Sequence, residues 1–465
     1  MMSVTTPSQP TKRAGILINR NFGWLWLGQS ISFIGDSVFD FTLVIWIAFG
    51  LGKGQPWAPL GVSAVLIITS IAMLVAGPIA GVFVDRWDKR RTLLRVMIIQ
   101  GIGVAAVLLA TDIVPLPFLA HGVLPLEWKL ILIYVAVFFV NSAAQFTRPS
   151  RLALMGDIVP EPQQPQASGL LEVVFNLSFI IGYGVAPVMF TVFGARLAII
   201  IDAASFAIAF LAILLVRAPK AARSLSERQR GHVGREFWTG LRFYFGNRVL
   251  RTILVGYVLG LLGAGAINAL YVFFITQNLH APVAAVGTFT ITFGIGLLIG
   301  ALAGSFIVRR LGLTRVFWLS FLMVGVTAIA LSRQTSLLPT LALSLLMAFP
   351  QGISNVALAP LLLREAPREL VGRATAVLES SIMLAQVISI ASAGYIASTV
   401  LHGFHLTVLG ASFGPYDTLV LLAGVMSLIG GVYVMLNLPH SKSAPISPVR
   451  ESDPATRVFE KTPAI

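Results

Sequence analysis

The sequence predicts an all-α integral membrane protein whose twelve transmembrane helices form two pseudo-symmetric bundles of six. Three observations lead to this fold class. Hydrophobic residues make up 56% of the 465 residues and charged residues only 11%, whereas an average soluble protein carries about 25% charged residues. The apolar residues fall into runs long enough to cross a bilayer. The basic residues lie mostly on one side of those runs.

Twelve runs approach the roughly 20 apolar residues that a helix needs to cross the hydrocarbon core. The first six lie near residues 22–50, 60–84, 92–112, 129–147, 168–193 and 196–217. The second six lie near residues 249–277, 284–308, 314–332, 337–363, 374–400 and 416–438. None of them alternates between apolar and polar residues over ~10 positions, which is the pattern of a transmembrane β-barrel.

These runs divide the chain into five regions. We expect a cytoplasmic tail (1–20), an N-terminal bundle (21–217), a basic linker (218–248), a C-terminal bundle (249–438) and a disordered cytoplasmic tail (439–465). Within the linker, Phe237, Leu241 and Phe245 recur every four residues, which predicts a short amphipathic helix on the inner leaflet. For the first half of the linker, a simply solvated segment is an equal alternative.

The distribution of basic residues predicts the topology. If both ends are cytoplasmic, all but four of the 33 Lys and Arg residues face the cytoplasm, the exceptions being Lys53, Lys129, Arg196 and Arg333. Cytoplasmic loops of membrane proteins carry such a basic excess. The net charge of +14 therefore reflects topology and contact with membrane lipid, and we expect no nucleic-acid partner. We expect a plasma or inner membrane location.

The two halves of the chain resemble each other. The turns before the fifth and eleventh spans align at a constant offset of 207 residues, which pairs Pro160 with Pro367 and Glu172 with Glu379. The loop after the second span is echoed by residues 304–310 after the eighth. Transporters built from two parallel halves show such repeats and bind substrate between the halves at mid-membrane.

The loop after the second span reads GVFVDRWDKRR from Gly81 to Arg91. A glycine here permits close helix packing, and Asp85 can lie at the positive N-terminal end of a neighbouring helix. The arginines can bind carboxylates or helix C-termini. An ordinary basic loop is the alternative, but the position and the partial copy favour a cytoplasmic gating loop made of Gly81, Asp85, Arg86, Arg90, Arg91, Arg309 and Arg310.

This loop resembles the Gly-x-x-x-Asp-Arg-x-Gly-Arg-Arg signature of the major facilitator superfamily, with Asp88 where glycine is usual. The segments 21–36 and 240–251 resemble the branch that includes macrolide-efflux-type and enterobactin-exporter-type proteins. The resemblance covers residues 18–438. It implies proton-coupled export of a small, often amphiphilic molecule by alternating access.

Two features depart from the drug antiporters of that superfamily. Their fourth span often contains a deep arginine, whereas this chain offers Asn141 and Gln145. Their fifth-span motif is only partly present, as the helix-packing residues Gly182, Ala186 and Pro187. A proton relay built on the fourth-span arginine therefore does not carry over.

Acidic residues within the spans are candidates for proton or substrate coupling, because each costs roughly 2.5–3.5 kcal/mol at a helix centre. Asp36 and Asp40 lie four residues apart on one face of the first span and repel each other. They could instead make structural hydrogen bonds. For Glu172 and Glu379, near the cytoplasmic side, a gating ion pair is favoured over coupling. We expect Asp202 to pair with Arg196.

A second set of residues could line a substrate cavity, although aromatic residues in a span more often pack or face lipid. The set comprises Phe39, Asn141, Gln145, Asn176, Tyr183, Asn268, Tyr271 and Gln386. The six histidines are scattered, so no metal site is expected. There are no cysteines, no phosphate-binding loop and no catalytic constellation. We expect a transporter that is not an enzyme, needs no cofactor and draws energy from an ion or substrate gradient.

Several functions fit this fold. The favoured hypothesis is export of hydrophobic or amphiphilic compounds, such as drugs or macrolides, driven by protons. The spans contain almost no Lys or Arg, which favours neutral or cationic substrates over anions. Export of one endogenous metabolite such as a siderophore is the alternative; nutrient import and a non-transporting sensor are weaker. Twelve spans suffice for one transport path, so a monomer is expected.

Overall fold

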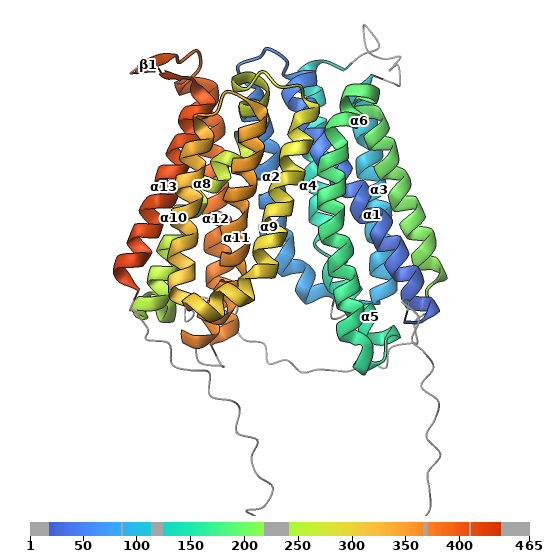
Figure 1. Cartoon of the computed structure of the whole chain (residues 1–465). Helices are drawn as coiled ribbons and strands as arrows, with labels where there is room; N and C mark the ends of the chain where they lie inside the picture. Colours follow the sequence, from blue (N-terminus) through green and yellow to red (C-terminus); the bar gives the residue numbers. More distant parts are fainter. Residues whose placement is uncertain are drawn as a thin grey trace, which may run out of the picture.

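The computed structural model describes residues 18–84, 87–112, 124–217, 241–365, 370–408 and 411–438. Figure 1 shows two groups of upright helices side by side, one from each half of the chain. The N-terminal group contains α1 (Arg20–Ile45), η1 (Trp46–Leu51), α2 (Ala58–Val84), α3 (Lys89–Val107), η2 (Leu108–Thr111), α4 (Leu126–Ala144), α5 (Thr147–Ile158), η3 (Glu161–Gln163) and α6 (Gln164–Leu215).

The C-terminal group begins with an unlabelled helical turn at residues 241–246. It continues with α8 (Arg248–Phe273), η4 (Phe274–Asn278), α9 (Ala284–Leu311), α10 (Leu313–Ser332), α11 (Leu337–Glu365), α12 (Val371–Tyr395), η5 (Ile396–Val400), β1 (Leu406–Val408), β2 (Ala411–Phe413) and α13 (Pro415–Asn437). The short antiparallel hairpin β1–β2 was not predicted. The expected tails up to residue 17 and from 439, and linker residues 218–240, lie outside the described residues.

Helix α6 crosses the fold twice because the chain reverses at Gly194, whose φ of +69° suits glycine. Its first arm runs parallel to α1, as the Trp26–Leu170 hydrogen bond near one end and the Phe41–Tyr183 ring contact further along show. Its second arm runs antiparallel, with Ala209 against Gly28 near that same end.

The described residues contain eleven helical segments long and apolar enough to span a membrane, and α6 counts among them once. Because α6 supplies two crossings, the described chain has twelve. Their bounds agree with the predicted runs to within a few residues. The predicted all-α fold of twelve spans is therefore confirmed.

The two halves repeat each other in detail. Asn19 caps α1 by accepting a hydrogen bond from the Phe22 amide (2.8 Å), and Asn247 caps α8, 228 residues later, by accepting one from the Val249 amide (2.9 Å). The first turn of a helix needs such acceptors for its free N–H groups. Both helices end in a π-helical turn at the same 228-residue offset, η1 and η4. The offset also pairs Gly28 with Gly256 and Gly35 with Gly263.

Small residues bring the helices together. A β-carbon at Gly296 of α9 would lie 2.5 Å from the Leu345 carbonyl of α11, and one at Gly352 of α11 would lie 2.8 Å from the Ala301 amide of α9. Lipid provides no hydrophobic drive for helix association, so close backbone packing takes its place. These contacts hold α9 closely against α11 in the C-terminal bundle.

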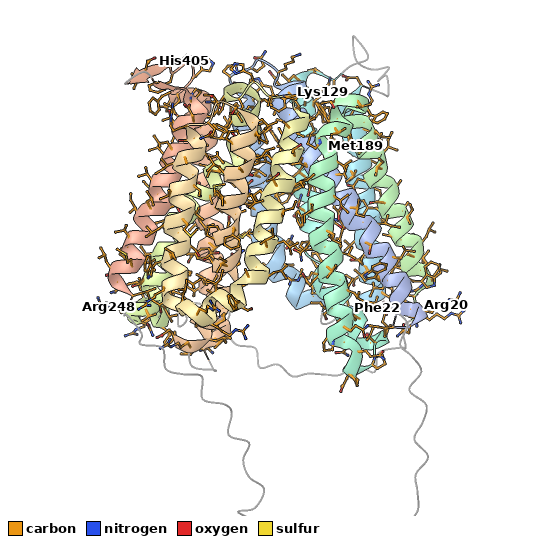
Figure 2. The ribbon with its side chains drawn as sticks, viewed as in Figure 1. Arg20, Phe22, Lys129, Met189, Arg248 and His405 are labelled. Carbon is orange, nitrogen blue, oxygen red and sulfur yellow. The ribbon has the colours of Figure 1, made fainter. Side chains whose placement is uncertain are left out.

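The two ends of the molecule differ. Figure 2 places Arg20 and Arg248 at one end, here called the basic end, and Lys129 and His405 at the other, here called the opposite end. The bundles meet toward the opposite end and diverge toward the basic end (Figure 1).

Contacts between the bundles involve α2 with α12 and η5, and α6 with α9. The Leu60 amide donates to the Ser398 hydroxyl (3.0 Å), and Gly394 packs against Ser63. A β-carbon at Gly287 would overlap with the carbonyl of Gly184. All of these residues lie in the halves of their helices nearest the opposite end, so this end is closed by tight packing.

Candidate functional site

Asp36 and Asp40 lie one helical turn apart in the C-terminal half of α1. Asp36 is half-buried and accepts a long hydrogen bond from the Ser32 hydroxyl (3.5 Å). Asp40 is exposed although its neighbours Phe39 and Phe41 are buried, so its side chain faces open space beside α1. Within the described residues, no Lys or Arg forms an ion pair with either carboxyl group.

Asp202 joins this pair from the second arm of α6, which sequence reasoning did not foresee. It does not pair with Arg196, whose guanidinium donates instead to the Thr111 carbonyl (3.0 Å). Asp202 is fully buried and faces α1, where a β-carbon at Gly35 would lie 2.6 Å from its Oδ1. The charges of Asp36 and Asp40 both act on it. The expected ion pair is therefore corrected to a cluster of three carboxyl groups.

A row of aromatic rings runs beside these acids and crosses from one bundle to the other. From the basic end, successive ring centroids lie 5.2, 4.9, 5.4, 4.7, 6.3 and 5.6 Å apart along Phe33, Phe175, Phe179, Tyr183, Phe41, Tyr271 and Phe289. Phe175 and Phe179 are exposed, and Tyr183 and Tyr271 are half-buried. Of these seven residues, only Tyr183 and Tyr271 were predicted.

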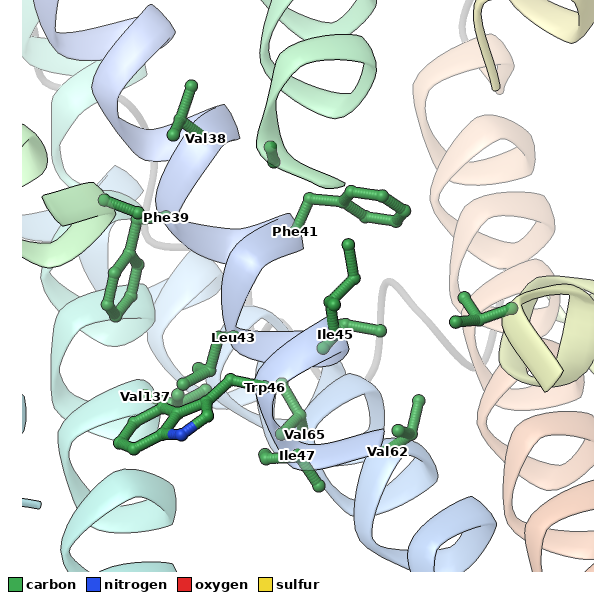
Figure 3. Close-up of a cluster of buried hydrophobic side chains, with 14 of the residues drawn as sticks. Val38, Phe39, Phe41, Leu43, Ile45, Trp46, Ile47, Val62, Val65 and Val137 are labelled. Atoms are coloured by element: carbon green, nitrogen blue, oxygen red, sulfur yellow. The ribbon is translucent and has the colours of Figure 1, made fainter. Parts of the chain in front are cut away.

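Phe39 does not belong to this row. Phe39 and Phe41 are equally buried, at 3% and 4% exposed, but Phe39 lies on the opposite side of α1 from Phe41 and Ile45, as Figure 3 shows. Its placement does not fit the expectation that it lines a cavity. A helix turns 100° per residue, so positions two apart point in nearly opposite directions, and the sequence alone did not reveal which of the two phenylalanines faces the other bundle.

The predicted polar cavity residues are spread over several helices. Asn268 on α8 is exposed and is the counterpart of Asp40 under the 228-residue offset, and Gln386 on α12 is half-buried. On α4, Asn141 and Gln145 donate to backbone carbonyls one turn earlier, at 3.0 and 3.2 Å. Asn176 does the same toward Glu172 (2.8 Å).

Glu172 and Glu379 are both exposed toward the basic end. Glu172 lies 3.9 Å from Arg148 of α5, whereas the neighbouring Arg151 is buried and donates to Gln29 of α1 (3.3 Å). Among the described ion pairs, none includes Glu379. Helix α5, which lies between the fourth and fifth predicted spans, positions both arginines.

The gating loop is described only in part, since Asp85 and Arg86 lie outside the described residues. Arg90 donates to the Ile213 and Leu214 carbonyls (3.2 and 2.6 Å) at the C-terminal end of α6, where a positive charge stabilises the helix. Asp88 caps α3 by accepting from the Arg91 amide (2.7 Å), which accounts for aspartate where glycine is usual. Gly81 lies in the last turn of α2, which ends at Val84.

The repeated loop follows α9. Arg309 donates to the Ser305 carbonyl of its own helix (3.2 Å), and the Arg310 guanidinium lies 4.3 Å from the centre of the Phe306 ring. Both arginines are exposed at the last turn of the helix. They interact within one bundle, as Arg90 does.

The three helix-packing residues of the fifth span lie on the first arm of α6. A β-carbon at Gly182 would lie 3.0 Å from the Val38 amide of α1, and Ala186 is fully buried. The Pro187 ring lies against Gly287 of α9. This segment therefore contacts α1 through Gly182 and α9 of the C-terminal bundle through Pro187.

A separate cavity of about 360 Å³ opens at the opposite end. It is lined by Trp46, Leu51, Ala110, Thr111, Asp112, Lys129, Phe193, Gly194, Ala195 and Arg196. Lys129 and Asp112 form an ion pair there. This cavity lies away from the carboxyl cluster and within the N-terminal bundle alone. The described residues contain no group of three or more His, Asp or Glu side chains that could hold a metal ion.

Comparison with known proteins supports a transporter. The chain is 23% identical to an uncharacterized MFS-type transporter, YkuC, of Bacillus subtilis over 81% of this chain and 85% of that one. It is 22% identical to macrolide efflux protein A of Streptococcus pyogenes over 60% of this chain and 65% of that protein. It is 26% identical to the multidrug efflux pump Tap of Mycolicibacterium fortuitum over 83% and 94% of the two chains.

Solved transporter structures share the fold. A nucleoside transporter NupG mutant matches with a TM-score of 0.68 at 14% identity, covering 90% of this chain and all of that one. A bacterial homologue of the iron transporter ferroportin in its inward-facing state also scores 0.68, at 16% identity over 90% and 98% of the two chains. The family model of the Major Facilitator Superfamily matches residues 25–275 and 253–464. With these matches and its twelve spans in two repeated bundles, this chain belongs to the major facilitator superfamily.

Proposed function

We propose that this chain is a secondary active transporter that exports small hydrophobic or amphiphilic compounds in exchange for protons. The observation that carries the proposal is the pairing of Asp36 and Asp40 with a row of aromatic rings that bridges the two bundles. The carboxyl groups couple transport to protons, and the aromatic rings bind the substrate.

Asp36 and Asp40 support coupling because a charge inside a membrane costs free energy. A carboxylate in the middle of a span must be accompanied by a proton or a cation. The described basic residues form no ion pair with Asp36 or Asp40. Asp40 is exposed to the space beside α1, where a proton and a positively charged substrate can replace each other. Such exchange couples the export of substrate to the entry of protons.

The aromatic row indicates the kind of substrate. Ring faces bind apolar groups by contact and cations through the negative charge of the π system. Tyr183 and Phe41 come from the N-terminal bundle, and Tyr271 and Phe289 from the C-terminal one. A substrate seated here touches both halves. The relatives named for macrolide and multidrug efflux favour export of such compounds.

The difference between the two ends of the molecule supports alternating access. Basic residues gather at the basic end, which we assign to the cytoplasm of a cell whose plasma membrane holds the protein, with both termini inside. The packed contacts at the opposite end then close the outer side, so the site opens to the cytoplasm. Because one chain contains both bundles, we propose that a monomer transports.

Purified protein in liposomes, with an imposed pH gradient and a pH-sensitive dye, tests this function. Tetraphenylphosphonium and erythromycin are added in turn to the wild type, to Asp36→Asn and to Glu127→Gln. Glu127 is an exposed acid at the start of α4 without an ion pair among the described residues, so it serves as the matched control.

We expect substrate-evoked proton flux in the wild type and the control and none in Asp36→Asn. Flux that persists in Asp36→Asn would remove that residue from the coupling site. Absence of flux in the wild type with both compounds would contradict proton-coupled export of this class and favour a single endogenous metabolite.

A further inference from the structure

We propose that Asp202 is a third exchanging carboxyl group of the coupling site, so that its proton moves together with those of Asp36 and Asp40. The inference rests on the proposed function and adds a residue from a different helix. Sequence reasoning had assigned Asp202 to an ion pair near the outer surface. The structure places it against α1 instead.

The surroundings of Asp202 leave its carboxyl group incompletely satisfied. The Ser205 hydroxyl lies 3.2 Å from Oδ1 and also 2.8 Å from the Asp202 carbonyl, so its single proton cannot serve both fully. Oδ2 is buried and accepts no hydrogen bond from any described protein group. A polar group in this state is usually explained by strain, by catalysis or by an unseen partner. A proton on the carboxyl group is the simplest partner.

Within the described residues, no Lys or Arg forms an ion pair with Asp202. Asp36 and Asp40 of α1, both acids, interact with it electrostatically. Arg196, on the same arm of α6, binds the Thr111 carbonyl. Helix α3 meets this arm through Gly101 at the level of Phe206, and its Arg90 binds the Ile213 and Leu214 carbonyls at the far end of the arm. Three acids without a paired cation cannot all be charged at once inside a membrane.

Gly35 makes the arrangement possible. A β-carbon there would overlap with the Ser205 hydroxyl and would lie 2.6 Å from Oδ1 of Asp202. Because Gly35 precedes Asp36, it brings the α6 carboxyl group next to the α1 pair. The three groups differ in exposure, from exposed Asp40 through half-buried Asp36 to sealed Asp202. This order suits a proton that enters at Asp40 and reaches the interior.

The C-terminal bundle provides an internal comparison. Under the 228-residue offset, Gly263 of α8 corresponds to Gly35, and it packs against Ala423 of α13. The counterpart of Asp36 is Ala264. In the C-terminal bundle the contact at this glycine therefore forms against the backbone of Ala423, with no aspartate at the contact. Helix packing alone does not require the acids, which points to a role in transport.

The test measures protons released when tetraphenylphosphonium binds to the full-length protein in detergent. Binding is followed calorimetrically in buffers of different ionisation enthalpy between pH 5.5 and 8.5, which gives the Kd and the number of protons released. The variants are Asp202→Asn, Asp202→Ala and the control Glu127→Gln. Thermal unfolding of each variant reports on the fold.

We expect both Asp202 variants to release fewer protons per bound cation than the wild type and to show a shallower dependence of Kd on pH. Their melting temperatures should equal or exceed that of the wild type, since Ala423 packs against the corresponding glycine, Gly263, in the other bundle. The control should match the wild type in every respect.

Two results would overturn the inference. An unchanged proton count and pH profile in both Asp202 variants would remove Asp202 from the exchange while leaving the proposed function intact. A lower melting temperature with an unchanged proton count would make Asp202 a structural residue. A wild type that binds the cation without releasing protons would contradict the proposed function as well, so the two failures are distinguishable.

Discussion

At the scale of single residues, the orientation of each side chain around its helix decides its role. Phe39 and Phe41 have the same chemistry and lie two residues apart, yet Phe39 packs within the N-terminal bundle while Phe41 contacts Tyr183 and Tyr271. Their different surroundings provide a matched pair for testing the aromatic row.

Replacement of Phe41 by leucine should weaken binding of an aromatic or cationic substrate while preserving apolar volume. A cation near an aromatic face gains about 0.5–2 kcal/mol, so the Kd should rise by about 2- to 30-fold. Fluorescence titration of the purified protein with tetraphenylphosphonium measures this change. Phe39→Leu is the control and should leave the Kd unchanged. Equal effects in both variants would show that the row does not contact the substrate.

At the scale of helices, glycines set how closely the spans pack, and capping residues set where the spans begin and end. Asn19 and Asn247 begin the first span of each bundle, and Arg90 closes the C-terminal end of α6. Arg90 lies in a loop named from the sequence as a gating loop, and in this conformation its guanidinium binds within its own bundle. It contributes to stability whether or not the loop also gates.

Replacement of Arg90 by glutamine should destabilise the N-terminal bundle, because two carbonyls lose a charged donor. Hydrogen bonds to charged groups contribute about 1.5–3 kcal/mol, so the free energy of unfolding should fall by about that amount. Thermal unfolding in detergent measures the loss. Arg91→Gln is the control, since the Arg91 side chain is exposed and only its backbone amide binds Asp88. A stable Arg90 variant would contradict the capping role.

The sequence predicted the fold well and the site only in part, for physical reasons. Long apolar runs and the distribution of basic residues report on the membrane itself, so the spans could be located without tertiary information. Which residues meet across helices depends on rotation and on close approach at glycines. The contact of Asp202 with α1 was not predicted because it forms at Gly35, and a residue without a side chain gives no sequence signal of such a contact. The 228-residue repeat, which pairs Gly35 with Gly263, was a signal that could have found it.

At the scale of the whole molecule, transport requires the bundles to separate at the opposite end. The contact of Gly394 with Ser63 joins α12 to α2 across the two halves. A β-carbon at Gly394 would lie 2.6 Å from the Ser63 β-carbon. Cβ atoms of a disulfide lie about 3.5–4.5 Å apart, so a small adjustment admits a bond. The chain has no cysteine of its own to interfere.

The double variant Ser63→Cys with Gly394→Cys should lose substrate transport on oxidation and regain it on reduction, because the disulfide holds the outer side closed. Uptake of tetraphenylphosphonium into liposomes measures this. The control pair Gly28→Cys with Ala212→Cys lies within one bundle, where a β-carbon at Gly28 would be 3.0 Å from that of Ala212. Its disulfide should leave transport active. Transport by the oxidised Ser63–Gly394 pair would contradict rocking about this contact.

The most direct test of the central claim is whether a substrate gradient alone moves protons. Liposomes containing the protein are prepared at equal internal and external pH, with the membrane potential clamped, and a tetraphenylphosphonium gradient is imposed. The account predicts proton movement opposite to the substrate in the wild type, building a pH gradient from none, and no such movement in Asp40→Asn. Substrate flux without proton movement in the wild type would contradict the account.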